Sequence, residues 1–254
     1  MSQLHISISA EPIFSLGGFN ITNSMLTSVL VTVLFILLIL IVSKTTRKST
    51  KPPKKYSFQS IVEFTIESFY EFVKGVVGPV KARVFFPLIA TLFFYILVAN
   101  WMGLLPGIGS IGLIKPVEAE STFVPLFRGA TADINTTLAL AVISMVMVQF
   151  YGFRYLGLHY LTKFFNFKSV MGFFIGILEL FSEFSKIISF TFRLFGNIFA
   201  GEVLLSVIAF LVPIFAPLPF LGLEVFVGVI QALVFAMLTL VFINMATISH
   251  EEEY

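Results

Sequence analysis

The feature that most limits how this chain can fold is a series of long apolar runs. The hydrocarbon core of a bilayer is about 30 Å thick, and about 20 helical residues cross it. The first clean run extends from Met25 to Val42, and longer ones follow. Charged residues make up only 12% of the 254 residues and hydrophobic residues 57%, whereas a soluble domain carries about 25% charged residues. The sequence therefore predicts an all-α polytopic membrane protein.

Five membrane spans are predicted, and together they form a single membrane domain that covers residues 1–254. The first span begins 24 residues into the chain and has no basic segment before it. We therefore interpret it as a span and not as a cleaved signal peptide. The predicted spans are residues 24–43, 84–105, 134–152, 170–215 and 221–249.

The basic residues predict how the chain is oriented. Residues 44–55 hold six of the 16 Lys and Arg residues and no acidic residue, and loops of this kind lie in the cytoplasm. The loop after the third span is also basic, with Arg154, Lys163 and Lys168 and no acidic residue. We therefore expect the N-terminus outside and the C-terminus inside. The paired prolines Pro52–Pro53 indicate a linker over 44–55 and not a helix.

Residues 56–78 form a different kind of helix. Glu63, Glu67 and Glu71 recur every four residues and Lys74 follows, which places one polar stripe on an otherwise apolar helix. Such a helix lies along the membrane surface. Docking of the stripe on a partner subunit is the alternative.

The last two predicted spans are unusually long. Residues 170–215 contain no proline except Pro213. A continuous helix of about 40 residues is about 60 Å long, which is twice what a perpendicular span needs, so we expect it to be steeply tilted or kinked. Pro213, Pro217 and Pro219 predict a short turn, and residues 221–249 return through the membrane. The two helices form a long tilted hairpin.

This hairpin carries ionisable residues, which are costly inside a membrane and suggest a function. Lys186 and Glu179 precede Arg193 by seven and fourteen positions, so they lie within about 40° of it around the helix, and Asn197 shares their stripe. Glu202 follows nine positions after Arg193 and points about 180° away. The six ionisable residues of the hairpin are Glu179, Glu183, Lys186, Arg193, Glu202 and Glu224.

These charges are also separated by depth. Glu179 and Glu183 lie toward one end of the hairpin, while Glu202 and Glu224 lie near its turn. Arg193, which stays protonated in proteins, falls between the two acidic sets. The arrangement predicts two polar access routes with a fixed cation between them. Two structural alternatives remain open, since Glu183 could pair with Lys186, and Glu202 and Glu224 could be a packing pair that shares one proton.

Several segments resemble the subunit a family of F-type ATP synthases. The most specific run is FRLFGNIFAGE, from Phe192 to Glu202. Weaker similarities follow the family's order: Asn100–Pro106 (NWMGLLP), Ala132–Thr137 (ADINTT), Gln231–Phe235 (QALVF) and Asn244–Ala246 (NMA). From its place near the end of the second span, the Asn100-Trp101 pair is also interpreted as an interfacial anchor.

The resemblance implies a function, namely a stator subunit of the membrane sector with two offset half-channels that couple proton flow to rotation of a c-ring. It implies that Arg193 faces the ring, that Glu202, Glu224, Asn197 and Gln231 line the outer half-channel, and that Glu179 and Ser182 belong to the inner one. Accessory polar positions are Glu183, Lys186, Asp133 and Asn135. The implied partners are the ring of c subunits, the b subunits of the peripheral stalk, the rest of the ATP synthase and the lipid bilayer. The implied location is a bacterial plasma membrane, which is favoured over an organelle inner membrane.

Other functions receive less support from the residues. There is no cysteine, which excludes disulfides and Cys–zinc sites. The three histidines are His5, His159 and His250, and neither a metalloprotease motif nor a serine-hydrolase motif occurs. No phosphate-binding loop of the G-x-x-x-x-G-K-[ST] type is present, so the chain is not expected to be an enzyme on its own, nor to bind a cofactor, a metal or nucleic acid. A self-contained channel or carrier and, less so, an intramembrane enzyme remain alternatives.

Overall fold

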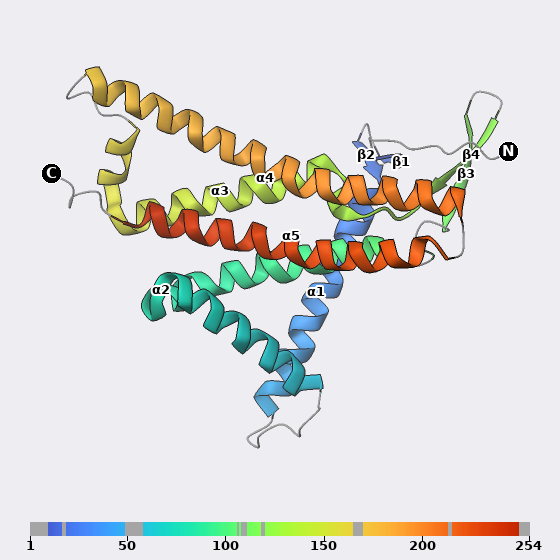
Figure 1. Cartoon of the computed structure of the whole chain (residues 1–254), viewed down its shortest axis with the longest axis horizontal. Helices are drawn as coiled ribbons and strands as arrows, with labels where there is room; N and C mark the ends of the chain where they lie inside the picture. The colour runs from blue at the N-terminus through green and yellow to red at the C-terminus, as the bar shows by residue number, and fades with distance from the viewer. Residues whose placement is uncertain are drawn as a thin grey trace.

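The computed structural model describes residues 10–16, 19–48, 58–105, 107, 111–117, 120–164, 170–212 and 215–248. Five long helices dominate it (Figure 1), as the apolar runs predict. They are α1 (Asn23–Lys48), α2 (Phe58–Leu104), α3 (Ile134–Leu156), α4 (Val170–Leu211) and α5 (Pro217–Ala246). In the described part of the chain, these are the five helices that are long and apolar enough to cross a membrane.

The second half of α2 packs mainly against α5, and α3, α4 and α5 pack against one another (Figure 1), so that the four helices enclose the core. Buried apolar side chains from all of them meet there, among them Phe85, Met145, Phe190 and Phe235. Phe190 of α4 meets Phe235 of α5 edge to face, with ring centroids 4.7 Å apart, a geometry that aromatic pairs favour. The core therefore fixes α4 and α5 against each other at mid-length.

Helix α1 stands apart from this bundle. It slants away from the other helices (Figure 1), and most of its apolar side chains are exposed, including Val33, Leu37 and Ile41. It contains residues 44–48 of the segment predicted to be a linker, so the prediction of a non-helical linker over 44–55 was wrong at its start. The prolines that end a helix come only at Pro52–Pro53, and residues 49–57 lie outside the described residues.

Helix α2 holds residues 58–78 of the predicted surface helix, 56–78, and residues 84–104 of the predicted second span, 84–105. Residues 56 and 57 lie outside the described residues. The surface helix and the span are separated at Gly78, where φ is 78° and ψ is 165°, a conformation that glycine adopts without steric cost. Pro79 follows, and a proline disfavours the helical conformation in the residue before it but is well suited to start a helix. No loop separates the two elements, because the helix resumes at Pro79.

The turn of the hairpin differs from its prediction. Pro217 and Pro219 lie in the first turn of α5 and not in the turn between the helices, because a proline there loses no helical hydrogen bond. Helix α5 ends at Ala246, three residues before the predicted end, with Thr247 as its C-cap. Helices α4 and α5 converge toward the turn and diverge toward their other ends (Figure 1).

Short elements that the sequence did not predict lie between the helices. Strands β1 (Pro12–Leu16) and β2 (Phe19–Thr22) form one antiparallel hairpin, and β3 (Gly112–Val117) and β4 (Glu120–Pro125) form another. Two 3₁₀ helices, η2 (Ala130–Ala132) and η3 (Gly157–Lys163), flank α3. The strand hairpins lie toward the end of the bundle where α4 and α5 meet, and η3 lies at the opposite end (Figure 1).

Candidate functional site

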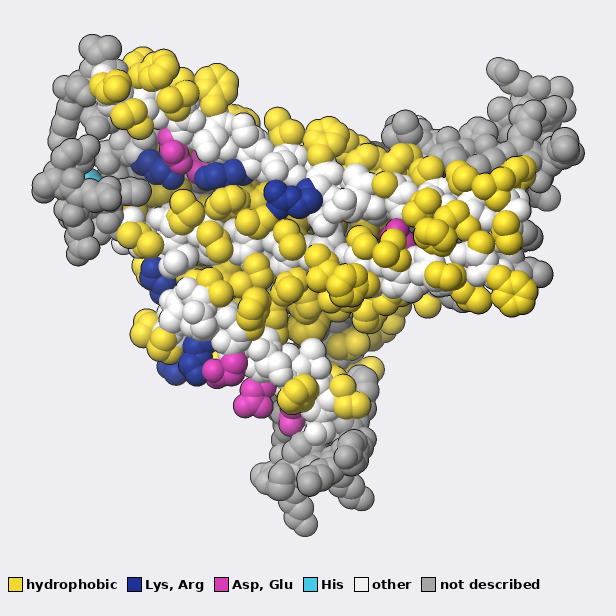
Figure 2. Space-filling view, in the orientation of Figure 1, with side chains coloured by type: hydrophobic (Ala, Val, Ile, Leu, Met, Phe, Trp, Pro, Cys, Tyr) yellow, Lys and Arg dark blue, Asp and Glu magenta, His cyan; other side chains and the backbone are white. Residues whose placement is uncertain are grey.

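The outside of the bundle is mostly apolar, with charged groups at particular places. Figure 2 shows hydrophobic side chains along the whole face, while most of the charged side chains visible there gather toward the end that holds the C-terminus. The hairpin α4–α5 carries the six ionisable residues that the sequence assigned to it. They separate into three places along the hairpin.

The first place, which we call the Lys163 cluster, lies near the start of α4. Lys163 of η3 forms an ion pair with Glu179, with Nζ and Oε1 2.6 Å apart, and its Nζ lies 3.8 Å from Oε1 of Glu183. Lys186 pairs with Glu183 at 2.7 Å, so the structure contains the structural ion pair considered from their spacing. The members of the cluster are Gln149, Tyr160, Lys163, Glu179, Glu183 and Lys186.

A hydrogen-bonded chain ties this cluster to α3. Gln149 donates from Nε2 to Glu183 at 3.0 Å and accepts at Oε1 from the Tyr160 hydroxyl at 2.8 Å. Tyr160 is buried, and its ring lies where a side chain at Gly152 would stand. Ser182, predicted beside Glu179, is exposed on α4.

The second place is Arg193, near the middle of α4. Its guanidinium donates to the Ser189 hydroxyl at 3.3 Å and lies 5.8 Å from the centre of the Phe190 ring. Among the described residues, no carboxylate forms an ion pair with it. Arg193 is half-buried, and Ser189 and Asn197 on the same stripe of α4 are exposed, so a permanent cation lies at the partly exposed surface of the helix.

Asn197 and Gln231 connect the two helices one turn farther along. Asn197 donates from Nδ2 to Oε1 of Gln231 at 2.7 Å. Gln231 is buried, and its Nε2 has no hydrogen-bond partner in the described part of the chain. A buried amide N–H without a partner is costly, so this position suits a water molecule or a polar group arriving from outside the chain.

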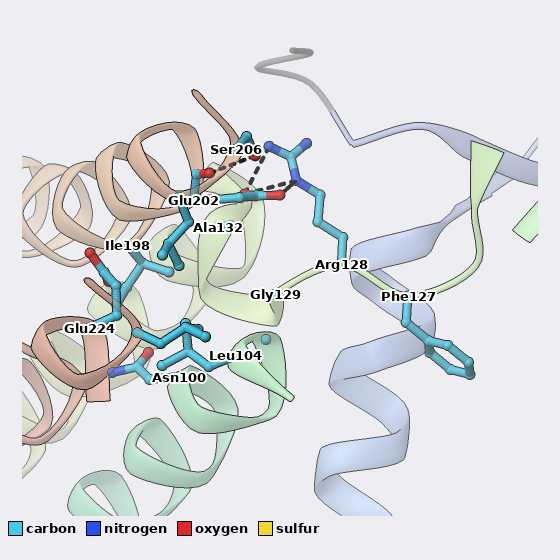
Figure 3. Close-up of a pocket in the computed structure, with 13 residues that line it drawn as sticks. Asn100, Leu104, Phe127, Arg128, Gly129, Ala132, Ile198, Glu202, Ser206 and Glu224 are labelled. Carbon is cyan, nitrogen blue, oxygen red and sulfur yellow. Dashed lines mark hydrogen bonds and ion pairs between the residues drawn. The ribbon is translucent and has the colours of Figure 1, made fainter. Parts of the chain in front are cut away.

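The third place is a cavity of about 240 Å³ near the hairpin turn, which we call the Glu202–Glu224 cavity. Glu202 of α4 and Glu224 of α5 both line it, as their predicted shared path requires (Figure 3). Its other polar lining residues are Asn100, Arg128 and Ser206.

The charge partner of Glu202 in this cavity is Arg128, a residue that helical periodicity did not single out. Arg128 Nε lies 3.3 Å from each carboxylate oxygen of Glu202, and Nη2 lies 3.4 Å from Oε2. Glu202 and Glu224 are therefore not an isolated acidic pair. Arg128 comes from the segment before η2, and an i,i+3 or i,i+4 pattern within one helix cannot reveal a partner from a loop.

Glu224 has a different environment. It is buried, and no ion pair links it to another described residue. Its carboxyl group lies directly against Gly201 of α4, where a Cβ would overlap with it. The glycine thus makes room for the acid.

Asp133 and Asn135 lie outside this cavity. Asp133 is the N-cap of α3 and accepts from the Asn135 backbone N–H at 3.0 Å, as N-cap residues do. Its other oxygen accepts from the Ser24 hydroxyl of α1 at 2.6 Å. The two residues line a separate cavity of about 730 Å³ between α1, α2 and α3, and they join α1 to α3.

Asn100 and Trp101 hold α2 against α5. The Asn100 amide donates to the Gly228 carbonyl at 3.0 Å and accepts from the Thr131 hydroxyl at 2.7 Å, and the Trp101 indole donates to the Val225 carbonyl at 3.2 Å. The interpretation of Asn100 as an interfacial anchor was wrong, because its side chain is buried between helices. Within the described ranges, no three His, Asp or Glu side chains come together as metal ligands would.

Comparison with known proteins agrees with this arrangement. The profile of the ATP synthase A chain family matches residues 25–244, which include the hairpin charges and both cavities' helices. ATP synthase subunit a of Gloeobacter violaceus is 33% identical over 209 residues, which are 82% of this chain and 78% of the relative. The chain therefore belongs to the ATP synthase A chain family, whose subunit a is the proton-conducting, non-catalytic stator component of the membrane sector.

Proposed function

We propose that the Lys163 cluster and the Glu202–Glu224 cavity are the inner and outer half-channels of the proton path, and that Arg193 separates them. The two polar sites lie toward opposite ends of α4, with Arg193 between them. The observation that carries this proposal is the placement of Arg193 at the partly exposed surface of α4, where no described carboxylate forms an ion pair with it. A cation placed in this way suits a carboxylate on another subunit.

The physical logic is that of a rotating carrier. A carboxyl group that crosses lipid on a c subunit must be neutral, because a bare charge there is costly. When it reaches Arg193, the opposite charge favours the ionised form and promotes release of the proton. The same cation opposes direct passage of protons between the two half-channels. Proton flow is thereby coupled to rotation.

The proposed proton path also suggests the partners of the chain and its orientation in the membrane. The ring of c subunits would pack on the side of α4 that holds Arg193, with the exposed apolar side chains Ile188 and Phe192 beside it. The exposed apolar side of α1 would contact lipid and the b subunits of the peripheral stalk. The basic segment 44–55 supports a cytoplasmic loop and an external N-terminus, and the bacterial relative supports a bacterial plasma membrane. The residues proposed for proton translocation are Arg193, Glu202, Glu224, Asn197, Gln231, Glu179 and Ser182.

The decisive experiment replaces Arg193 with alanine in the assembled ATP synthase. We expect ATP-driven proton pumping, measured by quenching of a pH-sensitive dye in inverted membrane vesicles, to be lost while the complex still assembles. Arg154→Ala is the matched control, because it removes an exposed cation from the end of α3. Wild-type pumping by the Arg193→Ala complex would overturn the proposal.

A further inference from the structure

Arg128 has no role in the half-channels as proposed, yet it reaches into one of them. It is 9% exposed and lines the Glu202–Glu224 cavity. Figure 3 shows its side chain extending from the segment before η2 to the carboxylate of Glu202 on α4. A charge pair at the cavity wall therefore joins the loop before η2 to α4, two segments that are distant in sequence.

The backbone around Arg128 is held on two sides. Its backbone N–H donates to the Thr27 hydroxyl of α1 at 3.2 Å, and Thr27 is fully buried. Next to it, Gly129 lies so close to Gly103 of α2 that a Cβ on Gly103 would come within 2.9 Å of the Gly129 Cα. The backbone that carries the Arg128 guanidinium is thus held in place independently of the contact with Glu202.

The geometry of the charge pair restricts Glu202. Both carboxylate oxygens lie 3.3 Å from Nε of Arg128. The guanidinium donates from Nε and Nη2 to Oε2 of Glu202, and such charge-assisted hydrogen bonds restrict the orientation of the carboxylate as well as balancing its charge. The guanidinium also lies 5.9 Å from the centre of the Phe199 ring on the same helix. Glu202 is therefore a carboxylate held in place by a permanent cation.

Glu224 shares the cavity but not this restraint. It is 5% exposed, and no cation among the described residues pairs with it. Across the helix interface its carboxyl group lies against Gly201, where a Cβ would overlap with it. The two acids of the cavity are therefore chemically unequal.

We propose that Arg128 is a positioning residue of the outer half-channel, which holds Glu202 as a fixed counter-charge and leaves Glu224 as the acid that exchanges protons. In this scheme a proton from the outer solution binds the Glu224 carboxylate and then passes to an ionised carboxylate on the ring, which restores the Glu224 carboxylate. Glu202 keeps its charge throughout and balances Arg128. This inference rests on the proposed function, since it assigns roles within the half-channel proposed there.

A double-mutant comparison in the assembled ATP synthase tests the division of roles. Glu202→Gln removes the carboxylate that faces Arg128, and Arg128→Gln removes the cation that faces Glu202, so each should slow ATP-driven proton pumping about tenfold, within the coupling range of contacting residues. The double variant with both changes has a neutral pair in the same place. We expect it to pump at least about threefold faster than either single variant, which is within the same coupling range.

The matched comparison uses Glu224. Glu224→Gln should slow pumping, and adding Arg128→Gln to it should give no recovery. Equal rates for Glu202→Gln and the Arg128→Gln/Glu202→Gln double variant would overturn the inference, because Glu202 would then carry protons itself. That comparison remains decisive if Arg128→Gln alone fails to assemble. Arg193→Ala, measured in the same membranes, reports separately on the proposed function.

Discussion

The carboxyl group of Glu224 on α5 occupies the space beside Gly201 on α4 in which a side chain would otherwise stand. A Cβ on Gly201 would overlap with three atoms of that carboxyl group. Gly201 lies inside a regular helix, where glycine is less favourable than alanine by about 1 kcal/mol. Its presence is therefore explained by the close approach of Glu224 and not by backbone conformation.

This contact predicts that Gly201→Ala displaces the Glu224 carboxyl group from its place in the cavity. The carboxyl group is the far end of a flexible side chain, so the helices can stay together while the acid moves. We expect pumping to fall by about ten- to a hundredfold, the range in which a misplacement of about 1 Å affects a reacting group. Dye quenching in inverted vesicles measures the rate.

Gly222→Ala is the control for this substitution, because a Cβ on Gly222 of α5 meets nothing within 4 Å. It should pump as the wild type does. If Gly201→Ala also pumps at the wild-type rate with normal assembly, the position of Glu224 is not important for transfer.

The sequence predicts how the charged residues of the hairpin are placed around and along each helix, because helical periodicity alone fixes positions within a single helix. Glu179, Arg193 and Glu202 separate along α4 as expected. Periodicity cannot predict the partners that come from loops, such as Arg128 for Glu202 and Lys163 for Glu179. Those depend on tertiary packing that brings distant segments together.

The difference between local sequence pattern and tertiary packing also explains where other predicted elements differ from the structure. The proline at position 217 was assigned to a turn, although proline is equally suited to the first turn of a helix. The kink in α2 lies at Gly78, directly before Pro79, and this glycine–proline pair is visible in the sequence. Asn100 resembled an anchor at the membrane interface only because its hydrogen-bond partners, Gly228 and Thr131, lie far from it in sequence.

The ion pairs of the Lys163 cluster predict that reversing one charge lowers the stability of the protein. Lys163→Glu would place a third carboxylate beside Glu179 and Glu183, and like charges at this distance repel. The Lys163 and Glu179 side chains are each 28% exposed, so we expect a loss of about 1–2 kcal/mol, between the values for exposed and buried pairs. Thermal unfolding of the purified complex measures the effect.

Combining Lys163→Glu with Glu179→Lys restores two cations and two carboxylates to the cluster. The double variant should regain part of the lost stability, because an opposite-charge pair forms again. A double variant less stable than Lys163→Glu would show that the ion pair does not hold η3 to α4.

Asn100 provides a second stability prediction. Asn100→Leu keeps the side-chain size but removes the bonds to the Gly228 carbonyl and the Thr131 hydroxyl, both in a buried place. Leaving such groups unsatisfied costs about 1–3 kcal/mol. Thr131→Val, which removes only one of these bonds, is the graded control and should cost less. Equal thermal stability of the wild type and Asn100→Leu would contradict a clamp between α2 and α5.

The orientation of the chain leads to a labelling prediction, since single cysteines can be introduced without competition from native ones. Leu158, which is 82% exposed, belongs to η3, and Ile111, which is 55% exposed, directly precedes β3. The elements η3 and β3 lie at opposite ends of the bundle (Figure 1). The positive-inside rule places the basic segment around Lys51 in the cytoplasm. Leu158 follows the third predicted span, so it should lie on the same side as Lys51, while Ile111 should lie outside. A membrane-impermeant maleimide added to intact cells should therefore label Ile111→Cys and leave Leu158→Cys and Lys51→Cys unlabelled until the membrane is permeabilised.

Labelling of Lys51→Cys in intact cells would reverse the assigned sides of both half-channels. Labelling of both Ile111→Cys and Leu158→Cys would show that the two ends of the bundle do not face opposite sides of the membrane.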